Sequence, residues 1–199
     1  MKTDDIRIMA EPQTNTICRF TVDRPVYSQA SYYFASKQIA QGSSLAQRLF
    51  AFDGVTSVLI SHDQIEVGQD GGQDWRDLGK QIGGAIREHL ATGAPAVSDE
   101  LRSALPSPDQ IRERVQTVLD AEINPGVGQH GGFVRLVDVR ENNVLIQMSG
   151  GCQGCGMARM TLRNGIESAI RRCVPEVGAI VDTTDHASGR NPFYAASSS

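Results

Sequence analysis

The chain has 199 residues, of which 40% are hydrophobic and 21% are charged, and its formal net charge at pH 7 is -4. This composition fits one or two globular domains of roughly 100 residues and excludes a chain that is disordered throughout. An acidic chain without an overall basic field is not expected to bind nucleic acid. The first residues, MKTDDIRIMAEP, lack the pattern of a secretory signal, and no segment has the ~20 consecutive apolar residues of a membrane span. We therefore expect a cytoplasmic protein with reduced cysteines and no membrane partner.

The first half of the chain alternates strand and helix signals. Residues 16–22, TICRFTV, alternate apolar and polar side chains, which predicts a half-buried strand. Residues 43–54 begin with two serines and end with Asp-Gly, which favours a helix between them. Residues 55–60 and 64–68 predict a hairpin, and a longer helix is predicted from Asp74. Together these elements predict a small α+β domain over residues 1–92.

Two further interpretations concern side chains of this half. The apolar stripe of the long helix is formed by Trp75, Leu78, Ile82, Ile86 and Leu90. We interpret Trp75 as a core residue of that stripe, because it falls at helical spacing with the others. His62, in the predicted turn, and His89, near the end of the helix, are expected at the surface.

A linker and a second domain follow. Residues 93–107 mix Ala, Ser, Pro and Gly without a period, which predicts a flexible linker. Ser107, Pro108 and Gln110 combine an N-cap, a proline at the first helical position and a capping-box residue. A helix is therefore expected to start there and to end at Asn-Pro-Gly, residues 124–126.

The rest of the second domain reads as hairpin, loop, helix and short strand. Residues 133–139 and 144–149 predict an antiparallel hairpin, residues 157–174 a helix that ends before Pro175, and residues 178–182 a third strand. We place this domain at residues 108–185 and expect a disordered tail at 186–199. The predicted fold class is α+β, with two small α/β sandwich-like domains joined by the linker.

Residues 150–156, GGCQGCG, place Cys152 and Cys155 in a C-x-x-C loop. Such a loop brings two thiolates close enough to bind one metal centre, and glycines let the backbone fold around it. The loop leads into the N-terminus of a helix that carries Arg159 and Arg163. Because both the helix end and the arginines are positive, the local field is expected to favour thiolates and an anionic cluster bound by them. The alternative is that Arg159 and Arg163 are solvated residues of the helix surface.

Two thiolates are half of the ligand set that tetrahedral zinc and the common iron–sulfur clusters need. Cys18 and Cys173 lie on the predicted apolar faces of a strand and a helix, so both are interpreted as buried, inert cysteines. A second copy of the loop, contributed by another subunit across a two-fold axis, would supply the missing pair most simply. His130 is either a further ligand or a solvated loop residue.

Two other kinds of site remain open for the C-x-x-C pair. One is a thioredoxin-like redox centre, although that fold places its motif within a βαβ unit, whereas this loop follows a hairpin with no obvious crossover. The other is a structural zinc ion shared by two subunits. The first half of the chain shows no combination of residues typical of a catalytic site.

The stretch from Gly128 to Val177 resembles the C-terminal domain of the Nfu family of iron–sulfur cluster scaffold and carrier proteins, because the hairpin, GCxGC and the helix TLRNGIE occur in the same order. EPQTN, GSSLAQRLFAFDGV and DWRDL resemble the N-terminal domain of that family. His130 and Phe133 stand where the family more often has acidic residues. These two differences bear on the shape of the loop and on the choice of partners, but they do not alter the cysteine pair.

The resemblance implies a carrier without enzymatic activity. In such a protein a homodimer holds a 4Fe-4S cluster on Cys152 and Cys155 of each subunit, and the cluster passes from upstream assembly proteins to apo iron–sulfur proteins. The resemblance also implies a docking role for the N-terminal domain. Two ligands per chain suit such a carrier, since an incoming thiolate must be able to reach the cluster.

Overall fold

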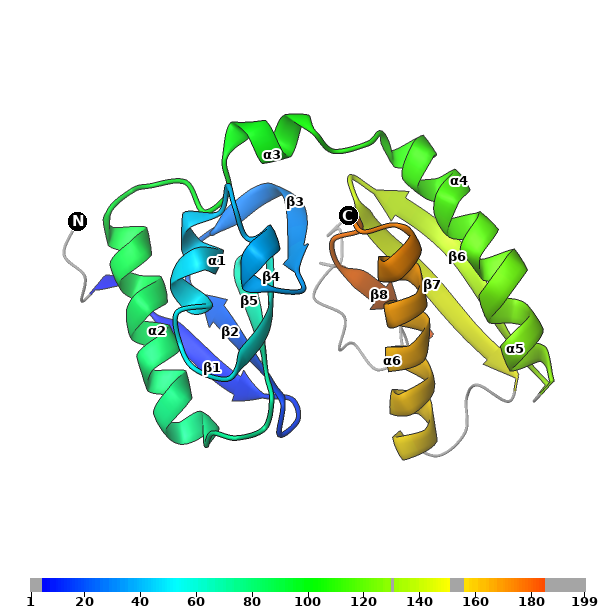
Figure 1. The fold of residues 1–199 in the computed structure, drawn as a ribbon, viewed down its shortest axis with the longest axis horizontal. Coiled ribbons are helices and arrows are strands. Elements are labelled where there is room, and N and C mark those ends of the chain that lie inside the picture. Colours follow the sequence, from blue (N-terminus) through cyan, green and yellow to red (C-terminus); the bar gives the residue numbers. More distant parts are fainter. Residues whose placement is uncertain (1–4, 130, 151–155, 185–199) are drawn as a thin grey trace, which may run out of the picture. The chain divides into compact units, whose positions relative to one another are not determined.

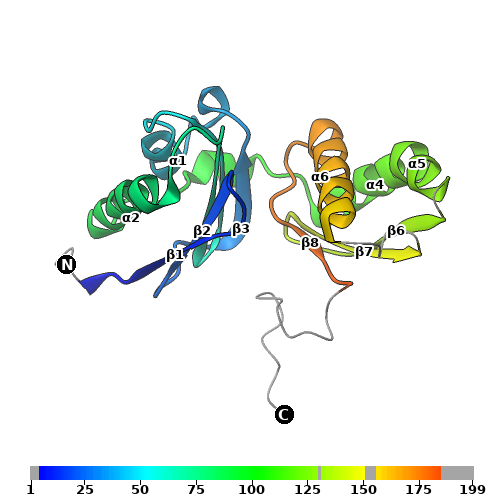
Figure 2. The ribbon, with the colours of Figure 1, turned by 90° about the horizontal axis from the view of Figure 1, so that it is seen from below.

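The computed structural model describes residues 5–129, 131–150 and 156–184. The chain divides into two compact units, Met1–Leu105 and Pro106–Ser199. In each unit the helices cover one face of a sheet (Figures 1 and 2), which confirms the predicted α+β class. No helix in the described ranges is both long enough and apolar enough to cross a membrane. The predicted tail lies outside the described residues.

Unit 1 is built on a five-stranded antiparallel sheet with the order β1-β2-β5-β4-β3. The strands are β1 (Ile8–Pro12), β2 (Ile17–Val22), β3 (Tyr27–Phe34), β4 (Val55–His62) and β5 (Gln64–Gln69). The predicted alternation of β2 is confirmed, since Cys18, Phe20 and Val22 are buried. The predicted hairpin is β4–β5, whose turn places His62 at a φ of 37°. β1 and β3 were not predicted.

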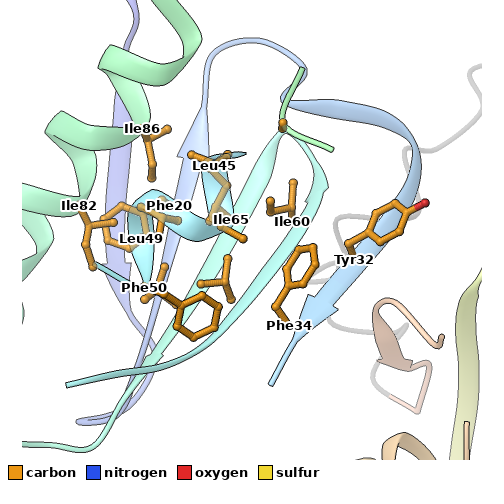
Figure 3. Close-up of a cluster of buried hydrophobic side chains, with 14 of the residues drawn as sticks. Phe20, Tyr32, Phe34, Leu45, Leu49, Phe50, Ile60, Ile65, Ile82 and Ile86 are labelled. Carbon is orange, nitrogen blue, oxygen red and sulfur yellow. The ribbon is translucent and has the colours of Figure 1, made fainter. Parts of the chain in front are cut away.

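The helices of unit 1 are the 3-10 turn η2 (Lys37–Ile39), α1 (Ser44–Leu49), α2 (Trp75–Ala91) and α3 (Asp99–Ser103). Both predicted helix starts are confirmed: the Ser43 side chain accepts a hydrogen bond from the Ala46 N–H, and Asp74 accepts one from the Arg76 N–H. Side chains of α1 and α2 pack on the sheet (Figure 3), and each large apolar side chain buried there stabilises the fold by roughly 1.5–3 kcal/mol. The largest fully buried side chains of this unit are Ile6, Phe20, Leu45, Leu49, Ile60, Ile65, Leu78, Ile82 and Ile86.

Residues 93–105, expected to be part of a flexible linker, instead pack on the core of unit 1. Ala96 and Val97 are buried in the core of unit 1, and Leu101 and Leu105 pack against it. The Ser43 hydroxyl donates a 2.7 Å hydrogen bond to the Ala96 carbonyl, which ties this segment to the start of α1. Val97, Leu101 and Leu105 are four residues apart, but the Ala, Ser, Pro and Gly residues around them were interpreted as linker composition, so this packing was not predicted.

His89 is buried, with 2% of its surface exposed, so the expectation of a surface position was wrong. It lies one helical turn beyond Ile86 and Ala85, where the end of α2 is covered by the chain that follows. Trp75 is buried as predicted, and its indole Nε1 donates hydrogen bonds to the Asn15 and Thr14 carbonyls at 3.0 and 3.2 Å.

Unit 2 packs its helices on a three-stranded sheet with the order β6-β7-β8. Its elements are α4 (Pro108–Val118), the π turn η3 (Leu119–Ile123), α5 (Asn124–Gly128), β6 (Gly132–Arg140), β7 (Asn143–Gly150), α6 (Gly156–Cys173) and β8 (Ile180–Asp182). The capping box at Ser107 and Gln110 is confirmed by hydrogen bonds in both directions. The predicted hairpin, helix and third strand are β6–β7, α6 and β8.

The Asn-Pro-Gly sequence does not end the first helix of unit 2 as expected. The helical path continues through the π turn into α5, where Pro125 occupies the first turn. A proline is tolerated there because its missing N–H removes no hydrogen bond that the turn needs. The break in the regular hydrogen-bond pattern falls at the π turn.

β7 and β8 are parallel, and α6 connects them. β7, α6 and β8 therefore form a β-α-β crossover, and the expectation that no crossover follows the hairpin was wrong. The short strand β8 gave no sequence signal for its direction. The reason is that a three-residue strand can pair in either orientation without changing its apolar pattern.

Candidate functional site

The ends of three elements frame the segment that carries the C-x-x-C motif. Gly132, the first residue of β6, pairs with Gly150, the last residue of β7, and Phe133 pairs with Ser149. β7 ends at Gly150, and α6 begins at Gly156, so the segment with the motif lies between these two elements in the chain. Cys152, Cys155 and His130 themselves lie outside the described residues. The motif is thus joined to a strand end on one side and a helix start on the other.

Hydrogen bonds hold the end of β7 in place. The Thr184 hydroxyl accepts a 2.9 Å hydrogen bond from the Met148 N–H, and the Thr183 N–H donates to the Ile146 carbonyl at 2.7 Å. The chain after β8 therefore continues beside β7 toward the motif. A fixed strand end gives the loop a defined starting point.

α6 presents its N-terminus to the motif, and this end of a helix carries partial positive charge. Ile166, Ala169 and Ile170 anchor the helix in the core of unit 2. Arg163 donates to Glu167 at 2.8 Å, so a carboxylate one turn further along offsets the charge that was expected to act on the cysteines. The side chain of Arg159 lies outside the described residues.

Cys18 is unsuited to complete a ligand set. Its side chain is fully buried within unit 1. Burial raises the pKa of the Cys18 thiol to about 11, so the thiol is neutral near pH 7. A metal ligand must be the thiolate, and the prediction of a buried cysteine at this position is confirmed.

Cys173 is exposed, so the prediction that it is buried was wrong. The apolar face of α6 continues from Ile170 to Val174 rather than to Cys173, because Val174 is fully buried at the helix end. At 1.5 Å per residue, Cys173 lies about 25 Å along the helix from Gly156. This distance excludes it from a site formed by Cys152 and Cys155.

The described residues around the motif form no cluster of metal ligands, but one of them is an exposed apolar side chain. In the described ranges, no group of three His, Cys, Asp or Glu residues could hold a metal ion. Phe133 is 51% exposed beside the end of β7. Phe133 already stood out in the sequence, because the family that the chain resembles more often has an acidic residue at this position.

The chain is similar to known proteins over both units. A model of the scaffold protein Nfu/NifU N-terminal domain matches residues 6–93, and a NifU-like domain model matches residues 115–181. A NifU-like protein of Schizosaccharomyces pombe is 32% identical over 160 residues, covering 76% of this chain and 62% of that protein. The Fe/S biogenesis protein NfuA of Pseudomonas aeruginosa is 47% identical over 85 residues, covering 42% of this chain and 44% of that protein.

Among solved structures, a NifU-like protein of Saccharomyces cerevisiae aligns with a TM-score of 0.42 and 21% identity, covering 47% of this chain and 84% of that chain. The matches to the curated relatives span between about two fifths and two thirds of those proteins. The order of the two matched domains is the order of the two units of the fold. The chain therefore belongs to the Nfu family, with an Nfu-type N-terminal domain followed by a NifU-like domain.

Proposed function

We propose that this chain is an iron–sulfur cluster carrier that binds a 4Fe-4S cluster between two copies of itself and transfers it to apo-proteins. Cys152 and Cys155 of each copy would supply the four thiolates. The observation that carries the proposal is the exclusion of the other two cysteines: Cys18 is buried with a neutral thiol, and Cys173 lies at the far end of α6. One chain thus offers two suitable thiolates, whereas the cluster needs four.

The similar proteins support the same role. A bacterial relative is named an Fe/S biogenesis protein, and its similarity to this chain extends over 85 residues. In this role the chain has no enzymatic activity. The cluster is cargo, and in the transfer step the thiolates of an acceptor protein replace those of Cys152 and Cys155 on iron. The donors would be cluster assembly proteins, and the acceptors would be apo iron–sulfur proteins.

Reconstitution under anaerobic conditions with iron and sulfide tests the proposal. The wild-type chain should become brown and bind about two iron and two sulfide ions per chain, because two chains would share one 4Fe-4S cluster. Cys152→Ser should lose both, whereas the matched control Cys173→Ser should retain both. Equal iron content in wild type and Cys152→Ser would contradict the proposal.

A second candidate function is a dithiol–disulfide oxidoreductase. One observation favours it: β7, α6 and β8 form a parallel crossover, and a C-x-x-C before the helix of such a unit is typical of thioredoxin-like redox sites. This alternative predicts a colourless monomer that catalyses disulfide reduction in a substrate such as insulin. The carrier proposal predicts no such catalysis above the rate of the free reductant.

A further inference from the structure

Unit 1 has a groove of about 1150 Å³ between helix α2 and the edge strand β1. Its sheet side is formed by Ile8, Ala10 and Pro12 of β1, with the fully buried side chains of Cys18 and Phe20 of β2 beside them. Its helix side is formed by residues of α2 from Trp75 to Arg87. Nothing in the proposed cluster chemistry uses this groove.

β1 has an open edge along the groove. In the described part of the chain its one sheet neighbour is β2. The Arg7 carbonyl accepts a hydrogen bond from the Asp23 N–H, so Arg7, Met9 and Glu11 direct their backbone groups toward β2. By the alternation of an antiparallel ladder, the N–H and C=O groups of Ile8 and Ala10 point to the free edge. These groups can pair with an added strand.

The helix side leaves room for a chain to lie close to it. Gly79 and Gly83 face the groove one turn apart, and a Cβ placed on either glycine would have no atom within 4 Å. An ordinary side chain at either position would project into the groove. Two glycines therefore keep the space between helix and strand open.

The same wall is positively charged, although the chain as a whole is acidic. Arg76 and Lys80 lie one turn apart on α2, are exposed, and have no ion-pair partner among the residues that the structure describes. Asp74, at one end of the groove, uses its carboxylate to cap α2, accepting from the Arg76 N–H at 2.8 Å. The groove thus offers two uncompensated cations beside an apolar floor.

Hydrogen bonds from α2 to the chain on either side of β1 mark both ends of the groove. The Trp75 indole donates to the Asn15 carbonyl at 3.0 Å, and Arg87 Nε donates to the Ile6 carbonyl at 3.0 Å. The twelve helical steps from Trp75 to Arg87 span about 18 Å, which is the length of about five extended residues. The groove has the length of a short peptide strand.

From these features we infer that the groove binds an extended acidic segment of a partner protein, which adds to β1 as a sixth strand while its carboxylates contact Arg76 and Lys80. A groove between an open strand edge and a helix is suited to strand addition, in which backbone hydrogen bonds give affinity and side-chain contacts give specificity. The basic wall selects acidic side chains by charge complementarity. The inference is independent of the cluster proposal, because no cysteine of the C-x-x-C motif takes part.

Fluorescence anisotropy with the full chain tests the inference. The probe is a labelled eight-residue peptide that alternates glutamate or aspartate with valine, and it should bind with a measurable Kd. Lys80→Glu should weaken binding at least tenfold, whereas the control Lys37→Glu, which makes the same charge change on exposed η2, should change Kd less than twofold. Gly83→Leu, which fills the groove, should abolish binding.

Three further probes separate strand addition from other modes of binding. The same peptide methylated on alternate backbone nitrogens should bind at least tenfold more weakly, and a lysine–valine peptide should not bind. A chain with Cys152→Ser and Cys155→Ser should bind as wild type does, which separates this inference from the cluster proposal. No binding by wild type, equal weakening by Lys80→Glu and Lys37→Glu, or equal affinity for an oligonucleotide of the same charge would overturn the inference.

Discussion

The side-chain amide of Asn124 makes two hydrogen bonds with the backbone of Val134: Oδ1 accepts from the N–H at 2.8 Å, and Nδ2 donates to the carbonyl at 3.0 Å. The amide thereby pairs with β6 as a neighbouring strand would. Because Val134 follows Gly132 and Phe133, this pairing fixes the start of β6 opposite the strand end that leads to the cysteine pair.

Asn124→Ala is expected to lower the free energy of unfolding of unit 2 by about 1–3 kcal/mol, because it leaves two backbone groups of Val134 without partners. Urea unfolding followed by circular dichroism measures this change. The control Gln116→Ala removes an exposed hydrogen bond to Asp120 and should cost well under about 1 kcal/mol. Equal effects of the two substitutions would contradict this assignment.

His89 should make the stability of unit 1 depend on pH. Burial lowers the pKa of the imidazole below its usual value of 6.5, and the charge of Arg48 acts in the same direction. Its Nε2 has no hydrogen-bond partner among the described residues. The unfolded chain therefore takes up the proton first, so the stabilisation is complete above pH 6.5 and is lost as the pH falls toward the lower folded-state pKa.

Urea unfolding at pH 7.5 and 5.5, followed by fluorescence of the single tryptophan, Trp75, measures this dependence. The wild-type chain should be less stable at pH 5.5, and His89→Leu should lose much of the difference. The control His62→Gln changes an exposed histidine and should keep the wild-type difference. An unchanged pH dependence in His89→Leu would show that other groups cause it.

Gly42 tests the packing of residues 93–105 on unit 1. Its φ is +85°, and a Cβ there would lie 2.8 Å from Leu101 Cγ. Gly42→Ala should lower the free energy of unfolding by about 1–2 kcal/mol or more, because it combines a strained backbone with a clash. The matched substitution Gly84→Ala, in the interior of α2 with no atom near the new Cβ, should instead stabilise the chain by up to about 1 kcal/mol.

The two other cysteines should react very differently with iodoacetamide at pH 8. In a chain with Cys152→Ser and Cys155→Ser, exposed Cys173 should be alkylated in the folded state. Cys18 should react only after unfolding, since it is buried and its pKa of about 11 leaves little thiolate at pH 8. Mass spectrometry of peptides resolves the two sites, and equal labelling of both would refute the assignment of Cys18 as an inert core residue.

Local signals in the sequence predicted the elements that begin with a cap or alternate regularly. Asp74 and Ser107 marked the starts of α2 and α4, and alternation marked β2. β3 was not predicted because Ala30, Ser31 and Tyr32 are buried in succession, where its register with β4 shifts. A bulge of this kind breaks the period of two on which strand prediction depends.

The prediction of the site was limited by long-range geometry. The spacing of Cys152 and Cys155 and the following helix could be read locally, and β7 and α6 flank the motif as expected. The exposure of Cys173 could not be predicted from the sequence. Cys173 and Val174 are neighbours at the end of α6, and a shift of the apolar face by one residue decides which of the two is buried. The parallel direction of β8 and the groove beside β1 also depend on tertiary packing, for which the sequence carries no periodic signal.

Native mass spectrometry of the anaerobically reconstituted chain tests the central proposal most directly. We predict that the cluster-loaded species has the mass of two chains plus one 4Fe-4S cluster, and that it is absent from Cys152→Ser and Cys155→Ser preparations. A loaded species with the mass of one chain plus a complete cluster would contradict the proposal that two copies share it.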